Sequence, residues 1–288
     1  MAPVESVSCP LCGLDQAVQV LQVGIRRIVR CRGCGMIYRN PRPSAADVGG
    51  AYGVDRGGAH GAAWFGERRG RNFRRFLERW EGPPGRLLDI GCGDGWFLQM
   101  AGERGWEAVG IDVSAEAVRQ ARERFRVGAR TGELQSFRFP DGAFDLMTLW
   151  NVLEVIPDPV PFLAEVRRVL APRGTLFIRT QNYLFQRLSF ALTGRVPRLR
   201  DHVAYIFHLM SFTPSSLRLL LERTGFVSIR VVNSPPTWGD PYRAVGAAEP
   251  LMIAGKVAVH AVVQTLWMVS GGRWILGPSL EAYARRGE

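Results

Sequence analysis

The feature that most constrains the fold is a glycine-rich segment, LLDIGCGDG, at residues 87–95. A short apolar run leads into it, and a helical pattern follows from Trp96 to Arg104. This order is typical of a tight turn that joins a buried strand to a helix. In open sheets built from alternating strands and helices, ligands bind at such turns, beside the carboxyl ends of the strands. The segment therefore predicts an α/β fold with a ligand site at this turn.

The same alternation continues along the chain. Strands are expected at residues 87–91, 106–112, 144–150, 174–180, 227–233 and 279–286. Helices are expected at residues 64–81, 96–104, 114–125, 159–170 and 213–226. Ser114 and Thr213 are expected to cap two of these helices, and Gly225 to end one. The pattern predicts a mostly parallel sheet covered by helices on both faces.

Two carboxylates accompany the glycine-rich turn. Asp89 precedes Gly91 by two residues, and Asp112 ends the next expected strand. Gly91 and Gly93 allow the backbone to approach a ligand closely, and Asp112 can accept hydrogen bonds from both hydroxyls of a ribose. The charge of Asp89 suits a ligand with a cationic amino group and disfavours the pyrophosphate of a dinucleotide.

Four of the five cysteines form two CxxC pairs, Cys9 with Cys12 and Cys31 with Cys34. Zinc binds four thiolates in a tetrahedron, and a CxxC turn brings two sulfurs to one ion. A segment of about 40 residues cannot build a sufficient apolar core, so a metal would stabilise it. We predict a structural zinc site; a redox dithiol pair and four separate buried cysteines are the alternatives. Cys92, in the glycine-rich turn, is interpreted as a small packing residue.

Four motifs carry a family resemblance: LLDIGCGDG, GIDVS, FPDGAFDLMTLWNVLEVIPDP and LAPRGTLFI. In this order they resemble the motifs of class I S-adenosylmethionine-dependent methyltransferases, most closely the branch related to ubiquinone and menaquinone biosynthesis. The resemblance covers residues 86–180 and extends through SFTPSSLRLLLERTGF. It implies a Rossmann-like, mostly parallel seven-stranded sheet with helices on both faces, plus a small N-terminal zinc ribbon. The CPxCG…CxxCG layout resembles bacterial methyltransferases found among polysaccharide and natural-product enzymes.

The resemblance also implies roles for single residues. Asp89, Gly91 and Gly93 would hold the methionine part of S-adenosylmethionine, Asp112 the ribose and Val113 the adenine, with Glu133 and Leu134 at the adenine edge and Trp150 and Asn151 facing the sulfonium. The family commonly reads Leu-Glu-His after the fourth strand, whereas this chain reads Leu153-Glu154-Val155. Any role of that histidine is absent here or is supplied elsewhere.

An alcohol or phenol acceptor would benefit from a general base. Of the four histidines, His208 and then His202 are the candidates, because they lie in the segment that helps to build the acceptor pocket in this fold. Either could instead cap or pack, and an amine or carbon acceptor needs no such base. Residues 183–211 combine aromatic side chains with arginines. They are interpreted as a lid over an acceptor that carries phosphate or lipid, or as amphipathic helices packed on the core.

Residues 250–276 are almost wholly apolar, but Lys256, His260 and Gln264 form one polar stripe at helical spacing. A charge in mid-span argues against full membrane insertion. A buried helix, a dimer helix and a helix lying at a membrane surface remain alternatives. The net charge of +11, almost entirely from arginine, indicates an anionic partner where arginines cluster, or merely the codon usage of a GC-rich genome.

Together these patterns predict three parts: a zinc ribbon (1–43), a helical linker or cap (44–84) and a methyltransferase domain (85–288) with insertions at 183–211 and 250–276. The predicted function is methyl transfer to a small-molecule or glycan acceptor, free or lipid-linked, most simply onto oxygen. An RNA methyltransferase and an inactive S-adenosylmethionine-binding scaffold are the alternatives. The N-terminus lacks a basic region followed by an apolar stretch, which predicts a cytoplasmic protein, with peripheral contact to the inner face of the membrane through the two insertions. The sequence does not indicate an oligomeric state.

Overall fold

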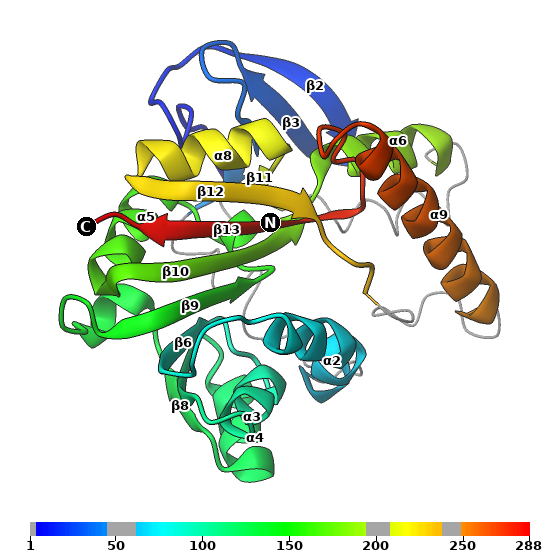
Figure 1. Cartoon of the computed structure of the whole chain (residues 1–288). Coiled ribbons are helices and arrows are strands. Elements are labelled where there is room, and N and C mark those ends of the chain that lie inside the picture. The colour runs from blue at the N-terminus through cyan, green and yellow to red at the C-terminus, as the bar shows by residue number, and fades with distance from the viewer. Residues whose placement is uncertain (1–3, 45–61, 194–207, 238–248) are drawn as a thin grey trace.

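The computed structural model describes residues 4–44, 62–193, 208–237 and 249–288 (Figure 1). Its centre is a seven-stranded sheet in the order β12-β13-β10-β9-β6-β7-β8. The strands are β6 (Arg86–Ile90), β7 (Glu107–Asp112), β8 (Gly128–Thr131), β9 (Phe144–Trp150), β10 (Leu170–Gln181), β12 (Phe226–Asn233) and β13 (Ser279–Arg286). All neighbours from β8 to β10 pair in parallel, and β13 runs antiparallel to β10 and β12. The mostly parallel seven-stranded sheet is therefore confirmed.

Helices cover both faces of this sheet. They are α2 (Ala62–Glu78), α3 (Trp96–Gly102), α4 (Ala115–Phe125), α5 (Pro159–Val169) and α8 (Pro214–Arg223). Leu146 and Phe177 point to one face, where they join a core cluster with side chains of α2, α3 and α4. Met147 and Ile178, the next residues along each strand, join a second cluster with α5 and α8. This alternation is what a strand buried on both faces produces.

The expected helix caps are present. Ser114 Oγ accepts a hydrogen bond from Ala117 N at 3.2 Å, and Thr213 Oγ1 accepts one from Ser216 N at 3.1 Å. The helix expected at 64–81 ends at Glu78, and the strand expected from residue 174 begins at Leu170. Strand β8 was not expected from the sequence.

The N-terminal segment forms most of a second, smaller sheet. Strands β2 (Ala17–Val23), β3 (Arg26–Cys31), β4 (Ile37–Arg39) and β11 (Met210–Ser211) pair antiparallel in the order β11-β4-β3-β2. Strand β1 (Val4–Glu5) pairs with β5 (Arg42–Pro43), and neither strand was expected from the sequence. Because β11 comes from the far part of the chain, the N-terminal sheet is completed by residues outside 1–43. It lies above α8 in Figure 1.

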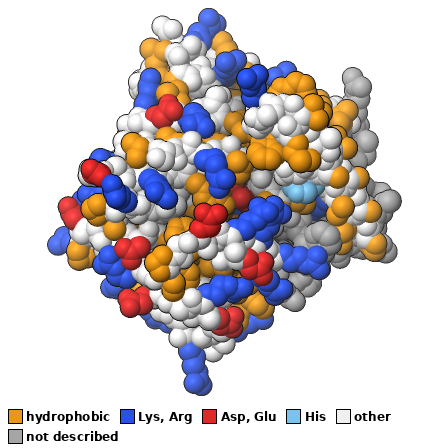
Figure 2. Space-filling model, in the orientation of Figure 1, with side chains coloured by type: hydrophobic (Ala, Val, Ile, Leu, Met, Phe, Trp, Pro, Cys, Tyr) orange, Lys and Arg blue, Asp and Glu red, His pale blue; other side chains and the backbone are white. Residues whose placement is uncertain are grey.

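Two helices lie beside the central sheet at one end of the molecule: α6 (Tyr183–Thr193) and α9 (Glu249–Val269). Many large apolar side chains of α9 are exposed, including Val262 at 59% and Met268 at 64%, whereas Val263 is buried. Hydrophobic side chains accordingly gather on the right-hand side of Figure 2, over α9. None of the helices in the described part of the chain combines the length and apolarity needed to cross a membrane.

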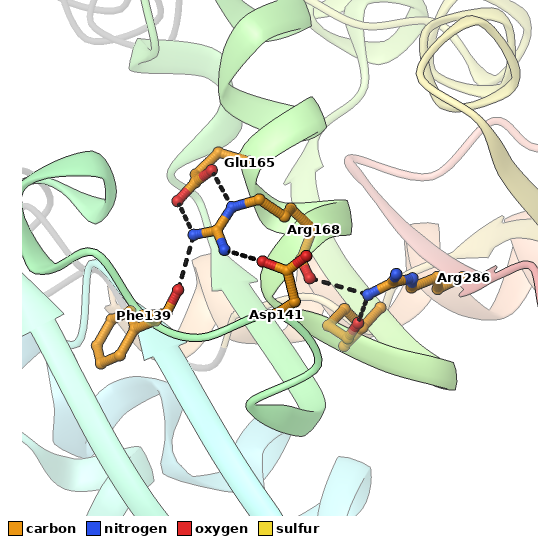
Figure 3. Close-up of polar contacts among 6 residues, drawn as sticks. Phe139, Asp141, Glu165, Arg168 and Arg286 are labelled. Carbon is orange, nitrogen blue, oxygen red and sulfur yellow. Dashed lines mark hydrogen bonds and ion pairs between the residues drawn. The ribbon is translucent and has the colours of Figure 1, made fainter.

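Two arginines, Arg168 and Arg286, connect the elements at the amino ends of the parallel strands (Figure 3). Arg168 on α5 pairs with Glu165 and Asp141, and its Nη2 donates to Phe139 O at 2.8 Å. Arg286, at the end of β13, donates to Arg168 O at 2.8 Å. These contacts hold together the turn before β9, the end of α5 and the last strand. The carboxyl ends of the parallel strands lie at the opposite edge of the sheet.

Candidate cofactor site and metal centre

A cavity of about 540 Å³ opens at the carboxyl ends of β6, β7 and β9. Seven of the residues expected to bind the cofactor lie on its wall: Gly91, Asp112, Val113, Glu133, Leu134, Trp150 and Asn151. The two others, Asp89 and Gly93, are not part of the wall. The geometry brings together residues from the ends of three neighbouring strands, as the topology of an open α/β sheet requires.

The turn after β6 is shaped by glycine. Gly91 has φ +72°, and a Cβ atom there would lie 2.4 Å from Val152 Cγ2. Any side chain at this position would therefore be strained and would collide with the neighbouring loop. Gly93, at φ +53°, has open space within 4 Å of the point where a Cβ atom would stand, so its backbone amide is accessible to a neighbouring acceptor.

That acceptor is Asp112. Gly93 N donates to Asp112 Oδ2 at 2.9 Å, and Ser114 N donates to Asp112 Oδ1 at 2.8 Å. Two backbone amides thus fix the carboxylate on the cavity wall, and each oxygen keeps a further lone pair for a ligand. Gly93 supports the site by orienting Asp112 rather than by lining the cavity.

Asp89 lies beneath the turn and is only 2% exposed. Its Oδ1 accepts a hydrogen bond from Thr148 Oγ1 at 2.6 Å. Burial, reinforced by the nearby charge of Asp112, raises the pKa of Asp89 to about 8. Around neutral pH, without a ligand, this carboxyl is therefore largely protonated.

Trp150 lies at the carboxyl end of β9, but its ring belongs to an aromatic cluster. The ring centroid is 4.8 Å from that of Phe73 and 4.6 Å from that of Phe177. The indole Nε1 is buried and has no hydrogen-bond partner among the described residues. Trp150 thus connects the cavity wall to α2 and the core behind it.

Behind Asn151 lies a buried polar network that was not expected from the sequence. Arg179, near the end of β10 and 3% exposed, donates from Nη1 to Asn151 Oδ1 at 2.7 Å and from Nε to Ser234 Oγ at 2.9 Å. Asn151 in turn donates to Glu154 Oε1 at 3.0 Å, and Thr180 Oγ1 donates to Glu154 Oε2 at 2.9 Å. The network holds Asn151 at φ +61°. A charged residue in the otherwise apolar run LFIRT was the available signal.

A second missed residue links the N-terminal sheet to the cavity. Arg42 is 8% exposed; it donates to Pro157 O at 2.6 Å and pairs with Glu5 at 2.9 Å and Asp158 at 3.5 Å. Pro157 and Asp158 both lie on the cavity wall. The end of the segment predicted as a zinc ribbon (1–43) therefore makes a buried contact with the rim of the site.

The two candidate bases are less well placed. His208 is half-buried and lies just before β11, which packs against the short helix Leu153–Val155 beside the cavity. It is not part of the cavity wall. His202 lies outside the described residues.

The four cysteines of the CxxC pairs converge on one point. Their sulfur atoms all lie within 4.8 Å of one another, with Cys9 Sγ 3.4 Å from Cys34 Sγ and Cys12 Sγ 3.6 Å from Cys31 Sγ. A zinc tetrahedron with bonds of about 2.3 Å separates its sulfurs by about 3.8 Å. The donor set and its spacing therefore fit zinc. Cys92 is buried away from this cluster, and burial raises the pKa of its thiol, in keeping with a packing role.

Fold and cavity define the class of protein: a Rossmann-like α/β protein with a cavity at the carboxyl edge of its sheet, where open α/β sheets bind their ligands. The family described as "Methyltransferase domain" matches residues 64–231, more than half of the chain. The chain belongs to this family and is an S-adenosylmethionine-dependent methyltransferase.

Two relatives illustrate the likeness. A protein of Mycolicibacterium smegmatis named "Probable S-adenosylmethionine-dependent methyltransferase" is 30% identical over 188 residues, which cover 65% of this chain and 68% of the relative. A ubiquinone biosynthesis O-methyltransferase of Methylococcus capsulatus is 31% identical over 121 residues, or 40% of this chain. The chain spans about half (51%) of the length of that second relative.

Solved structures share the fold. Phosphoethanolamine N-methyltransferase 2 of Haemonchus contortus, in complex with S-adenosylmethionine, matches with a TM-score of 0.55 and 19% identity, covering 88% of this chain and 63% of that one. A SAM-dependent methyltransferase of Archaeoglobus fulgidus matches with a TM-score of 0.51 and 18% identity, covering 76% of this chain and 94% of that one.

Proposed function

We propose that the chain transfers a methyl group from S-adenosylmethionine to a hydroxyl of a small-molecule or glycan acceptor, free or lipid-linked. The observation that carries the proposal is the Asp112 carboxylate, fixed by the amides of Gly93 and Ser114 on the wall of the 540 Å³ cavity. Two hydroxyls of a ribose suit the lone pairs that remain on this carboxylate. Some relatives named O-methyltransferase support oxygen as the acceptor atom.

In this proposal the cofactor lies along the cavity. Asp112 holds the ribose, Val113, Glu133 and Leu134 border the adenine, and Gly91 allows the methionine part to approach the backbone. Asp89, beneath the turn, would lose its proton and attract the cationic amino group once the cofactor is bound, and Trp150 and Asn151 would face the reacting end. When bound, S-adenosylmethionine supplies an electrophilic methyl group, so the protein's main task is to align the acceptor with it.

The acceptor side is assigned to the elements beyond β10. The Arg179 network would keep the Asn151 side chain in one orientation beside the methyl group. His208, held next to β11, is the proposed base that would take the proton from the acceptor hydroxyl, with His202 as the second candidate. Glu154, which stands where the family resemblance places an acid, would act through Asn151 and Thr180 rather than on the acceptor itself.

We infer that the four cysteines bind one structural zinc ion, because four thiolates leave no open position for catalysis. We also propose that the exposed apolar sides of α6 and α9 make peripheral contact with a membrane, which would suit a lipid-linked acceptor. Leu188 and Leu192 on α6 are 58% and 73% exposed. Apolar side chains in such an array are typical of helices that lie at a membrane surface.

The test replaces Asp112 by asparagine, which keeps the shape of the side chain and removes its charge. Calorimetry with S-adenosylhomocysteine should show binding weakened by about 10- to 100-fold, the loss expected for hydrogen bonds to a charged group. Asp141→Asn is the matched control, since Asp141 lies in the cluster at the opposite edge of the sheet. Equal binding by wild type and Asp112→Asn would contradict the assignment.

The acceptor is sought with radiolabelled S-adenosylmethionine and fractionated cell extract. Label in the lipid or glycan fraction supports the proposal, and label in RNA would support the alternative. RNA-binding proteins commonly stack bases on aromatic side chains, but Tyr38, an aromatic residue of the N-terminal segment, is only 2% exposed, which disfavours RNA. Tight binding without transfer to any fraction would indicate an inactive scaffold.

A further inference from the structure

A second cavity, of about 320 Å³, lies where the N-terminal sheet meets α6 and the start of α8. Its wall combines residues from β3, α6 and α8, and it shares no wall residue with the cofactor cavity. We call it the arginine pocket, because the charged side chains among its described wall residues are Arg30 and Arg187, with no aspartate or glutamate among them. Its volume is at the lower end of those that hold small ligands.

The two arginines are available to a ligand. Within the described parts of the chain, neither guanidinium has a hydrogen bond or an ion pair with another residue. The Arg30 side chain follows the backbone at Gly35, where its Nη2 lies 3.7 Å from the position of a Cβ atom. No carboxylate is among the described wall residues, although the Cys34 thiolate of the proposed zinc centre shares the wall. The arginines therefore favour an anion on the side of the pocket away from Cys34, and arginine binds phosphate and carboxylate through its planar fork.

Tyr183 shows that both guanidiniums act on the same place. Its side chain is 4% exposed and lies on the wall of the pocket. Burial raises the pKa of the Tyr183 hydroxyl, while the positive charges of Arg187 and Arg30 oppose that rise. The two cations, from segments more than 150 residues apart, therefore share the pocket wall with this phenol, and both lie close enough for their charges to act on it.

The start of α8 adds partial positive charge to the pocket, as the two arginines do. Its ten residues begin after Thr213, and Thr213 and Ser215 lie on the pocket wall. The capping box between Thr213 and Ser216 already occupies two backbone amides. The helix therefore contributes the positive end of its dipole and the exposed Ser215 hydroxyl rather than a ring of free amides.

We propose that the arginine pocket is a binding site for a phosphate group, either free or carried by a lipid headgroup. Arg30 and Arg187 would hold the phosphate oxygens from two sides, and Ser215 would donate a third hydrogen bond. Leu184 lies on the pocket wall and is 41% exposed, and Leu188 and Leu192 continue from it along α6 at helical spacing. An apolar chain attached to the phosphate could leave along this ridge. The site is separate from methyl transfer and does not depend on the proposed acceptor.

The test measures binding of inorganic phosphate by calorimetry, and binding to phosphatidylcholine vesicles with and without phosphatidic acid by flotation. Arg187→Gln should weaken whichever interaction occurs by about tenfold, as expected for the loss of a charge-assisted hydrogen bond. Arg223→Gln is the matched control: it removes the same charge from the last turn of α8, outside the pocket. Its binding should stay within about twofold of wild type.

The outcomes separate the sources and the alternatives. Binding of inorganic phosphate assigns a soluble ligand, and binding only to vesicles with phosphatidic acid assigns a lipid headgroup; both support the site if Arg187→Gln weakens them. Equal weakening by Arg187→Gln and Arg223→Gln, or no binding in either assay, would overturn the proposal. Arg30→Gln is measured together with its zinc content, because Cys34 shares the pocket wall. Asp112→Asn should bind phosphate like wild type, which keeps this test independent of the cofactor site.

Discussion

The N-terminal sheet and the central sheet are held together by different means. The central sheet buries apolar side chains on both faces, and residues such as Leu146, Met147 and Ile178 are fully buried. The N-terminal sheet has only a small cluster of its own, Val23, Ile28 and Ile37, and even this is completed by Tyr183 of α6. Its other buried residues, Met36 and Tyr38 among them, belong to the core cluster of the central domain. A segment too small for a core depends on its neighbour and, we propose, on a metal.

Removing the metal is expected to have the largest effect on this comparison. Binding of structural zinc contributes on the order of 10 kcal/mol to folding of small domains, so a chelator or Cys31→Ser should unfold the N-terminal sheet. Arg42 connects the N-terminal segment to the cavity rim by a hydrogen bond to Pro157 and an ion pair with Asp158. Cofactor binding should therefore weaken as well. Metal analysis and calorimetry with S-adenosylhomocysteine measure the two effects.

The fifth cysteine provides the control for that experiment. Cys92 is buried in the turn of the cofactor loop, so Cys92→Ser should retain one zinc ion per chain. A wild-type protein that contains no zinc and is indifferent to chelation would show that the cysteines pack without a metal. The contrast between the two sheets would then rest on apolar burial alone.

The two regions also differ in what the sequence revealed. The central strands carry largely apolar runs, and these were located correctly apart from the start of β10. Strand β8 was missed because it is an edge strand with the sequence GART, in which only Ala129 is buried. Strand β11 could not be foreseen, since its two residues acquire their pairing only when distant β4 is folded beside them.

The candidate site divides in the same way. Asp112 and Gly91 were found because the cofactor loop is encoded by adjacent residues with a recognisable spacing. Arg42 and Arg179 were missed because their roles come from tertiary contacts. Arg42 reaches residues 157 and 158, far along the chain, and Arg179 reaches Asn151, just after β9, and Ser234, just after β12. A local pattern cannot indicate such partners.

The response to pH should have opposite signs in the two regions, with a smaller effect than metal removal. Asp89 ionises near its ordinary pKa of 3.8 when unfolded, and burial raises its pKa to about 8 in the folded protein. Between these values the folded state holds a proton that the unfolded state has lost, so the free energy of unfolding falls as pH rises from about 4 to 8. Zinc binding instead requires deprotonated thiols and strengthens as pH rises.

Urea unfolding between pH 5 and 8 tests the Asp89 contribution. Because one pKa unit corresponds to about 1.4 kcal/mol, Asp89→Asn should remove a decline of a few kcal/mol that the wild type shows over this range. Burial also raises the pKa of Asp94, to about 7, and this contribution of the same sign remains in the variant. An identical pH dependence in wild type and Asp89→Asn would mean that Asp89 is ionised in the folded protein.

The variant with the smallest expected effect tests whether the N-terminal sheet and the central sheet unfold as one unit. Ser114 caps α4, on the face of the central sheet whose core cluster is separate from the one that includes Met36 and Tyr38. Ser114→Ala should lower the free energy of unfolding by about 1 kcal/mol and leave the amide that orients Asp112 in place.

Tryptophan fluorescence reports the central domain, since no tryptophan precedes residue 64, and zinc release to a coloured chelator reports the N-terminal sheet. Because the N-terminal sheet shares a core cluster and β11 with the central domain, both signals should shift together to lower urea concentration. If only the fluorescence shifts, the zinc-bearing segment is stable on its own, and the inference that it depends on the neighbouring core is wrong.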